Sequence, residues 1–218
     1  MSTTISEQVT AMRAGRPPQA ADQPMNPFET EQHALAAKGA PDGVIATGST
    51  LSDAELLDPH GISTSLYGAL GEDRTVVVFY RGAWCPFCNI ALRTYQSELL
   101  PVLERQGVAL VAISPQKPDG SLTMKEKDEL SFAVLSDPGN QVAAEVGILT
   151  TPSPDALAAQ LSHGLDLRQV NADSTATLPM PTTLIVDRDH TVRWVDVHPD
   201  YTTRSEPEEI LAALDSLR

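Results

Sequence analysis

The stretch Thr75-Val-Val-Val-Phe-Tyr-Arg-Gly-Ala-Trp-Cys-Pro-Phe-Cys88 decides the fold, because it joins an apolar β-branched run to both cysteines of the chain. A run of this kind predicts a buried strand. We expect the strand to lead through the Cys-Pro-Phe-Cys motif into a helix. Pro86 suits the first helical position, where its fixed φ and its missing N–H carry no penalty.

The two thiols of this motif are expected to lie on one helical turn, close enough to form a disulfide. Cys85 would occupy the exposed helix N-terminus, where free backbone N–H groups and the helix dipole favour a thiolate. We therefore expect Cys85 and Cys88 to cycle between dithiol and disulfide. Two alternatives are a buried pair without chemistry and half of a zinc site. The zinc site would need two more ligands, and the five histidines show no paired spacing, so neither a metal nor a cofactor is expected.

The composition is that of an acidic globular protein. The chain has 218 residues, enough for one domain with appendages or two small domains. With 29 acidic and 15 basic residues, its net charge of -14 argues against binding to nucleic acid or to an anionic membrane. Residues 1–18 do not resemble a secretory signal, and no stretch has the length and apolarity of a membrane span. We expect a cytoplasmic location, where a lone Cys-x-x-Cys motif is more often catalytic or metal-binding than structural.

The order of elements predicts an α/β domain preceded by an extension. Residues 1–43 are expected to form an N-terminal helical extension with a short first helix and a second helix over Phe28–Lys38. In residues 44–218, alternating strands and helices followed by a hairpin and a last helix predict a central mixed β-sheet flanked by helices. The expected strands cover residues 75–80, 108–114, 132–135, 182–186 and 191–197, with short extended segments on both sides of a turn at 58–61. The expected helices cover residues 65–70, 85–106, a short stretch near 123–126, 141–146 and 206–217. Pro101 is expected to kink or restart the helix over 85–106.

A long insertion over about residues 149–178 departs from this pattern. It is rich in Thr, Ser, Asp and Pro and contains one weak helical stretch, Pro154–Leu161. Insertions of this length are often lids or binding loops, and a tolerated surface excursion is the alternative. His163 within it is either an acid/base candidate or a solvated side chain.

Four motifs together resemble a known family: Arg81-Gly-Ala-Trp-Cys-Pro-Phe-Cys-Asn89, Ala112-Ile-Ser-Pro-Gln116, Ser136-Asp-Pro-Gly-Asn140 and Leu178-Pro-Met-Pro-Thr182. They look like the CxxC-bearing branch of the peroxiredoxin-like, AhpC/TSA-related proteins of the thioredoxin-fold superfamily. The resemblance implies a thioredoxin-like fold for residues 44–218. It also implies a thiol-dependent oxidoreductase without a cofactor that reduces hydroperoxides or protein disulfides, with thioredoxin or a low-molecular-weight thiol as electron donor. It leaves open whether the chain forms a homodimer.

The resemblance assigns roles residue by residue. Compared with peroxiredoxins, Cys88 matches the peroxidatic cysteine, while Cys85 replaces a threonine, Arg81 a proline and Pro181 an arginine. The hydroxyl and the guanidinium that bracket the peroxide are therefore expected to be missing. Compared with thioredoxins, Trp84 and both cysteines match the active site, and Pro181 matches its cis-proline. Thus Cys88 attacks first in the peroxiredoxin interpretation, and Cys85 attacks first in the thioredoxin interpretation.

Further residues receive supporting roles. Arg81 could stabilise a thiolate or a peroxide oxygen, or be a solvated surface arginine. Trp84 is expected to shield the site and contribute to recognition. A cis Met180-Pro181 bond would bring the Met180 backbone beside the dithiol, where an extended substrate could pair with it. Without the resemblance, a trans proline opening a strand is the expectation.

Two hypotheses about function follow from these residues. The first is a turnover enzyme that uses the Cys85/Cys88 pair. The second is a redox-sensing or scaffold protein that forms the disulfide once and signals through the 149–178 insertion. Repeated turnover with a reductant separates the two.

Overall fold

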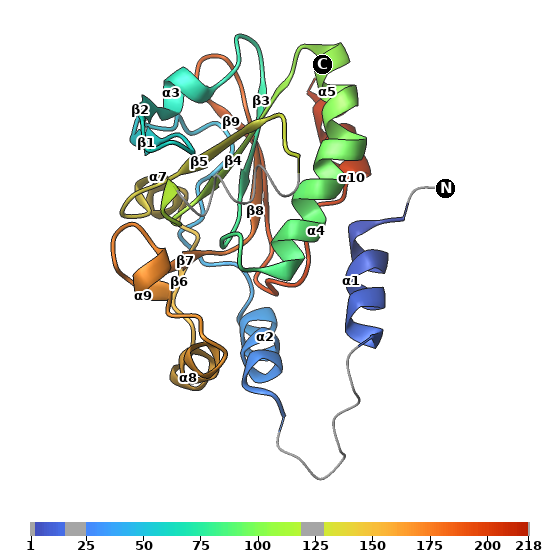
Figure 1. Ribbon diagram of the computed structural model, residues 1–218. Coiled ribbons are helices and arrows are strands. Elements are labelled where there is room, and N and C mark those ends of the chain that lie inside the picture. Colours follow the sequence, from blue (N-terminus) through green and yellow to red (C-terminus); the bar gives the residue numbers. More distant parts are fainter. Residues whose placement is uncertain (1–2, 16–24, 119–128, 218) are drawn as a thin grey trace.

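The computed structural model describes residues 3–15, 25–118 and 129–217, which contain a seven-stranded mixed sheet (Figure 1). The order of its strands is β2-β1-β5-β4-β3-β8-β9. The strands are β1 (Glu55–Leu57), β2 (Ser63–Ser65), β3 (Thr75–Phe79), β4 (Ala109–Ser114), β5 (Ala133–Ser136), β8 (Thr182–Val186) and β9 (Val192–Val197).

Strand β3 lies inside the sheet, as its β-branched sequence predicts. It pairs in parallel with β4, with Val77 opposite Val111, and antiparallel with β8, with Val77 opposite Leu184. All five residues of β3 are buried, because helices cover both faces of the sheet. The predicted mixed sheet and thioredoxin-like α/β architecture are confirmed.

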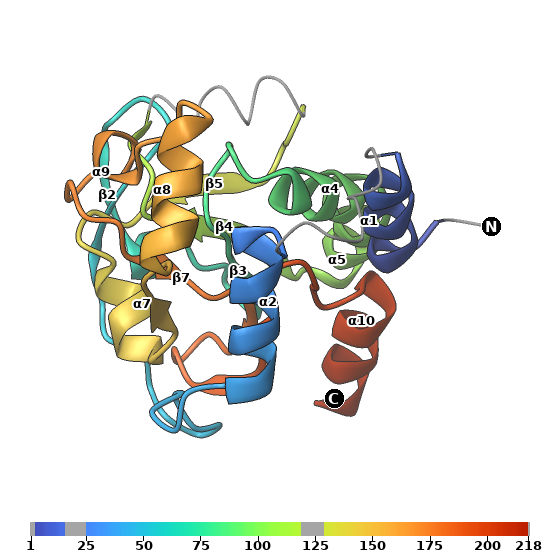
Figure 2. The same ribbon diagram turned by 90° about the horizontal axis from the view of Figure 1, so that it is seen from below.

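Helices pack on both faces of the sheet and beside it (Figures 1 and 2). Helices α1, α4, α5 and α10 lie on one face, and α3 and α7 lie on the other. The helices with these labels are α1 (Ile5–Ala14), α2 (Pro27–Lys38), α3 (Leu66–Ala69), α4 (Pro86–Thr94), α5 (Leu100–Gln106), α7 (Gln141–Val146), α8 (Pro154–Ser162), α9 (Leu167–Val170) and α10 (Pro207–Ser216).

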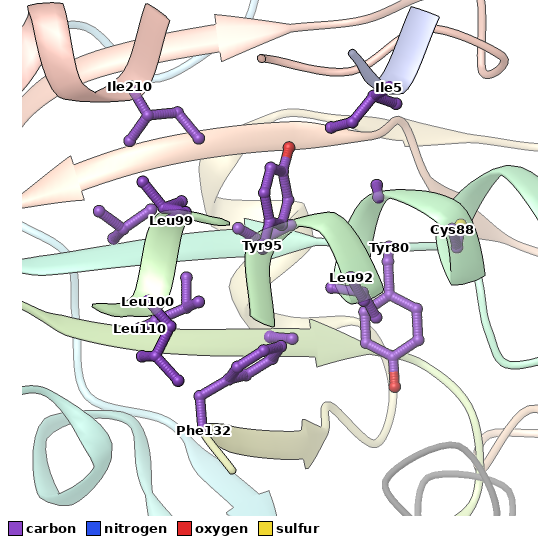
Figure 3. Close-up of a cluster of buried hydrophobic side chains, with 14 of the residues drawn as sticks. Ile5, Tyr80, Cys88, Leu92, Tyr95, Leu99, Leu100, Leu110, Phe132 and Ile210 are labelled. Carbon is purple, nitrogen blue, oxygen red and sulfur yellow. The ribbon is translucent and has the colours of Figure 1, made fainter. Parts of the chain in front are cut away.

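One hydrophobic cluster fills the space between the sheet and α4, α5 and α10 (Figure 3). Leu92 of α4, Leu99 of the turn that follows α4 and Ile210 of α10 are each at most 1% exposed. Ile5 of α1 belongs to the same cluster and is also 1% exposed. Cys88 therefore projects into an apolar interior, where a charge needs a specific partner.

The predicted helix over 85–106 is interrupted by a π-helical turn, η1 (Tyr95–Leu99), directly before α5. Pro101 has no N–H to donate to the carbonyl of Ser97, and the wider turn accommodates this loss. The Leu100 N–H donates to the carbonyl of Tyr95. The interruption that was expected at Pro101 is thus present and begins earlier, at Tyr95.

The N-terminal extension contacts the rest of the chain directly. The backbone N–H groups of Ile5 and Ser6 donate to the Glu206 carboxylate at 2.9 and 2.8 Å, which caps the start of α1. The second predicted helix is confirmed as α2. The domain boundary at residue 43 stays a prediction.

The insertion is more ordered than its composition suggests. Strands β6 (Leu149–Thr150) and β7 (Leu178–Pro179) pair antiparallel and close its base. Helix α8 packs against α2, and the Ser153 N–H donates to the carboxylate of Glu31 at 2.6 Å. The insertion therefore joins the N-terminal extension to form one wall of the molecule (Figure 2).

The remaining predicted elements agree with the structure within a few residues, apart from the short helix near 123–126, which lies outside the described residues. In the described ranges, no helix has both the length and the hydropathy needed to cross a membrane.

Candidate active site

The Cys-x-x-Cys motif forms the start of α4, as its sequence predicts. Cys85 is the N-cap residue and Pro86 the first helical residue. The N–H groups of Cys88 and Asn89 both donate to the Cys85 carbonyl at 3.1 Å. Both cysteines are free thiols on one helical turn. Each is only 1% exposed, so the expectation of an exposed Cys85 is wrong.

A guanidinium group contacts Cys88, which corrects the expectation that none is present. Arg204 Nη2 donates to Cys88 Sγ at 2.9 Å, and Arg204 itself is 6% exposed. Its Nη1 donates to the Tyr201 carbonyl at 2.8 Å. Arg204 belongs to the segment between β9 and α10. The sequence comparison had looked for the arginine of peroxiredoxins at position 181, where this chain has a proline.

The thiolate is stabilised at Cys88. Burial opposes its ionisation, but the hydrogen bond from Cys85, the charge of Arg204 and the backbone N–H and charge of Arg81 outweigh it and lower the pKa of Cys88 to about 5. Burial, followed by the hydrogen bond to Cys88 and its charge, raises the pKa of Cys85 well above its usual value.

The prediction that the helix N-terminus makes Cys85 the thiolate is therefore wrong. A helix end supplies about half a charge, whereas Arg204 supplies a full positive charge at hydrogen-bond distance from Cys88. The hydrogen bond between the two side chains raises the pKa of Cys85 and lowers that of Cys88, so it favours a protonated Cys85 beside a Cys88 thiolate.

Arg81 is a buried part of the site. It is 4% exposed, which excludes a solvated surface arginine. Its guanidinium carbon lies 3.8 Å from the ring centroid of Tyr201 and 5.2 Å from that of Trp84. The two rings hold the cation by cation–π contacts while its charge acts on Cys88.

Gly82 allows Trp84 to pack against this loop. Its φ of +144° is a conformation that residues with a side chain rarely adopt. A Cβ at Gly82 would collide with the indole nitrogen of Trp84 and approach Gln116 Oε1 at 2.8 Å. The Ala83 N–H donates to the same Gln116 Oε1 at 2.6 Å, which fixes the loop before Cys85.

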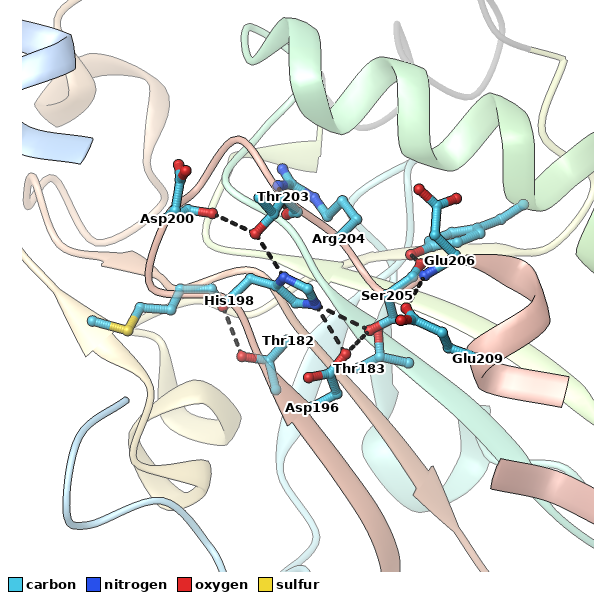
Figure 4. Close-up of polar contacts among 12 residues, drawn as sticks. Thr182, Thr183, Asp196, His198, Asp200, Thr203, Arg204, Ser205, Glu206 and Glu209 are labelled. Atoms are coloured by element: carbon cyan, nitrogen blue, oxygen red, sulfur yellow. Dashed lines mark hydrogen bonds and ion pairs between the residues drawn. The ribbon is translucent and has the colours of Figure 1, made fainter. Parts of the chain in front are cut away.

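A polar network fixes the segment that carries Arg204 (Figure 4). Ser205 Oγ donates to Asp196 Oδ2 at 2.7 Å, and His198 Nε2 lies 2.9 Å from the same oxygen. His198 Nδ1 lies 2.7 Å from Thr203 Oγ1. The hydrogen bond from His198 is the main reason that the pKa of Asp196 is lowered. The residues on both sides of Arg204 are thus anchored to β9.

The expected cis bond at Met180-Pro181 is wrong, because no peptide bond of the described residues is cis. Pro181 is a trans proline directly before β8, a position where its missing N–H removes no ladder hydrogen bond. The Met180 N–H donates to the Ile148 carbonyl at 2.8 Å, and the Met180 carbonyl accepts from Thr182 Oγ1 at 3.0 Å. These contacts leave the backbone of Met180 without a free N–H for an extended substrate.

A pocket of about 200 Å³ lies over Cys85. It brings together four of the seven predicted site residues, Arg81, Trp84, Cys85 and Pro86, whereas Cys88, Met180 and Pro181 are not among its lining residues. The other lining residues are Phe28, Gln32, Phe87, Gln160, His163, Leu165 and Tyr201.

The fold and the buried dithiol define a peroxiredoxin-like protein of the thioredoxin fold. The AhpC/TSA family model matches residues 47–195, well over half of the sequence. The chain belongs to the AhpC/TSA family.

Relatives and solved structures agree with this assignment. The chain is 33% identical to thiol-disulfide oxidoreductase ResA of Geobacillus kaustophilus over 49% of its own length and 62% of that protein. It is 33% identical to peroxiredoxin Bcp of Escherichia coli K12 over 43% of its own length and 58% of that protein. These alignments span about three fifths of each curated relative.

Among solved structures, peroxidoxin BcpB of Mycobacterium tuberculosis superimposes with a TM-score of 0.61 at 22% identity, covering 80% of this chain and 99% of that one. Reduced Prx3 of Vibrio vulnificus in complex with H2O2 superimposes with a TM-score of 0.63 at 20% identity, covering 78% of this chain and 99% of that one. These similarities establish the fold. Arg204 lies beyond the residues matched by the family model.

Proposed function

We propose that the protein is a thiol-dependent peroxidase in which the Cys88 thiolate attacks a hydroperoxide and Cys85 completes the disulfide. The observation that carries the proposal is the 2.9 Å hydrogen bond from Arg204 to Cys88. It supports a thiolate at neutral pH, and it would place a cation beside the oxygen atoms of a peroxide that reacts at Cys88.

The proposed reaction has two oxidative steps. The Cys88 sulfur attacks the terminal peroxide oxygen, the O–O bond breaks, and the released alkoxide or hydroxide takes up a proton, which leaves a sulfenic acid on Cys88. The Cys85 sulfur then attacks the Cys88 sulfur, and water leaves with the Cys85 proton. The Cys85–Cys88 disulfide that results needs two electrons from an external thiol to return to the dithiol.

The hydrogen bond between the two thiols supports this division of roles. Cys85 keeps its proton while Cys88 is ionised, since its pKa is raised and that of Cys88 is lowered. The low pKa of Cys88 also makes it the better leaving group when the disulfide is reduced.

The proposed electron donor is thioredoxin or a low-molecular-weight thiol. The proposed location is a reducing compartment such as the cytoplasm, where the activity would be antioxidant. Sedimentation of the reduced protein would test a homodimer.

A hydroperoxide consumption assay with a thiol donor tests the proposal. We expect repeated turnover by the native protein, and mass spectrometry of the peroxide-treated protein should show loss of two hydrogens within one peptide containing Cys85 and Cys88. Stoichiometric disulfide formation without turnover by any donor would instead support a redox sensor.

Reduction of protein disulfides is the second candidate. It is favoured by the position of Cys85 in the lining of the pocket and by the similarity to ResA, a thiol-disulfide oxidoreductase. In that reaction Cys85 attacks the partner disulfide, and Cys88→Ser should trap a mixed disulfide through Cys85 whereas Cys85→Ser traps none. Turnover of a protein disulfide without turnover of hydroperoxide would replace the first candidate with this one.

A further inference from the structure

The segment that carries Arg204 is irregular, and residues 203–206 belong to neither a helix nor a strand. Ser205, the next residue, is held by its hydroxyl, which donates to Asp196 Oδ2 of β9 at 2.7 Å and lies 3.0 Å from Thr183 Oγ1 of β8. These contacts fix the segment to the sheet, whereas Cys88 lies on a helix. The 2.9 Å contact between Arg204 and Cys88 therefore depends on how the segment is held against that helix.

Tyr95 joins the segment directly to the helix of Cys88. Its hydroxyl donates to the carbonyl oxygen of Ser205 at 2.7 Å. Tyr95 opens the π-helical turn that continues α4, about two turns beyond Cys88 (Figure 3). The same two segments are thus joined twice, once by Arg204 and Cys88 and once by Tyr95 and Ser205. The second contact limits the positions that the backbone of Arg204 can take relative to the sulfur.

The environment of the Tyr95 hydroxyl suits this role. Tyr95 and Ser205 are each 0% exposed, so water does not compete for the hydrogen bond. Burial raises the pKa of Tyr95 well above its usual range, and the hydroxyl therefore keeps its proton and remains a donor while Cys88 titrates. A phenylalanine would supply the same ring to the core, so packing alone does not account for a hydroxyl here.

We propose that Tyr95 is a positioning residue of the active site, which holds Arg204 beside the sulfur of Cys88 through the carbonyl of Ser205. The inference rests on the proposed function, because it assigns a further residue to the same site. Tyr95 acts through Arg204 and not on the sulfur itself. Loss of its hydroxyl should therefore weaken the contact between the cation and the thiolate without removing the cation.

Tyr95→Phe tests this role, since it removes the hydroxyl and keeps the ring that packs in the core. The ultraviolet absorbance of the thiolate, followed against pH in the reduced protein, gives the pKa of Cys88. We expect this pKa to rise by about half a unit to one unit, which corresponds to the net contribution of one hydrogen bond. The rise should be smaller than in Arg204→Gln, because the guanidinium is still present.

Tyr67→Phe is the matched control. The Tyr67 hydroxyl also donates to a backbone carbonyl, that of Leu51 at 2.6 Å, but Tyr67 packs against the hydrophobic cluster on the other face of the sheet. Both variants should unfold at a lower denaturant concentration than the native protein, because each loses a hydrogen bond of the same kind. Only Tyr95→Phe should change the pKa of Cys88. A purely structural role would lower stability in both and leave both titrations unchanged.

A double variant shows whether Tyr95 acts through Arg204. When Arg204→Gln is already present, Tyr95→Phe should cause no further rise in the pKa of Cys88, since no guanidinium is left to position. An unchanged pKa in Tyr95→Phe, an equal change in Tyr67→Phe, or the same rise with and without Arg204 would each overturn the inference.

The titration uses no hydroperoxide, so it is independent of the peroxidase proposal. A raised pKa in Tyr95→Phe together with a native protein that does not turn over hydroperoxide would support the role of Tyr95 and contradict the proposed function. Peroxide turnover by the native protein with an unchanged pKa in Tyr95→Phe would contradict the role of Tyr95 alone.

Discussion

Arg204 Nη2 lies 2.9 Å from Cys88 Sγ, which joins the segment before the last helix to the first turn of α4. Both groups are buried, so their charges interact with little screening by solvent. The contact stabilises the thiolate at Cys88 and distinguishes the two cysteines chemically. The first prediction follows from removing it.

Arg204→Gln should raise the pKa of Cys88, because it removes the positive charge beside the thiolate. An opposite charge at this distance changes a pKa by about 1 to 3 units. The ultraviolet absorbance of the thiolate, followed against pH, measures the shift. Arg188→Gln, at an exposed arginine of the turn between β8 and β9, serves as the control and should leave the titration unchanged. An unaltered midpoint in Arg204→Gln would show that the arginine does not set the pKa.

The ionisation of Cys88 should contribute stability to the reduced protein that rises with pH between about 5 and 9. The pKa of Cys88 is lowered from 9.0 to about 5 in the folded state, so the unfolded chain binds more protons throughout this window. This stabilisation is complete above pH 9.0, the pKa of Cys88 in the unfolded chain, and it is lost as the pH falls through about 5, its pKa in the folded protein. Above pH 9 the raised pKa of Cys85 reverses the slope.

Denaturant unfolding at a series of pH values checks this dependence. Cys88→Ser removes the titrating group, and its stability should depend less on pH in the same window. The oxidised protein has no thiol to titrate and should resemble that variant. Parallel curves for the native reduced protein and Cys88→Ser would contradict a lowered pKa at Cys88.

The two cysteine variants should differ in their reaction with hydroperoxide. Cys85→Ser keeps the Arg204 contact and should form a sulfenic acid on Cys88 that a dimedone-type probe labels. Cys88→Ser leaves Cys85 with a protonated thiol and should be labelled at least tenfold less, given the small thiolate fraction of an unactivated cysteine. Labelling confined to Cys88→Ser would reverse the assignment and favour a thioredoxin-like exchange enzyme.

Asp196→Asn tests whether the network behind Arg204 positions it. The carboxylate accepts hydrogen bonds from Ser205 and His198, and weakening them should cost about 1 to 3 kcal/mol of unfolding free energy. The pKa of Cys88 should also rise, by less than in Arg204→Gln, because the guanidinium is still present. Asp73→Asn, at an exposed carboxylate, is the control for both measurements. A loss of stability without a pKa shift would restrict the network to a structural role.

Most of the fold was predictable from the sequence, because its signals are local. The β-branched run of β3 and the cysteine motif after it predicted a strand entering a helix at Pro86, as observed. The hairpin of β8 and β9 was equally readable from alternating apolar runs and a polar turn. The π-helical turn was only partly predictable, since Pro101 indicates an interruption but not its hydrogen-bond pattern.

Only the site residues that lie near the cysteines in the sequence were predictable. Arg81, Trp84 and Pro86 are close to the cysteines in sequence, and each contributes to the pocket. Arg204 reaches Cys88 only through the tertiary fold, and its polar neighbours Thr203 and Ser205 give no periodic signal. The cis expectation at Pro181 came from the resemblance alone, and the strand-opening alternative agrees with the structure.

The wall formed by α2 and α8 and the reactive pair come from different parts of the fold. The sulfur atoms and their cation are fixed by the sheet, α4 and the segment before α10, whereas the entrance is made by helices at the periphery. Helix α2 lies before the residues shared with the family, 47–195. Helix α8 and both cysteines lie within those residues, so the surroundings of the dithiol combine a segment shared with the family and one from outside the match.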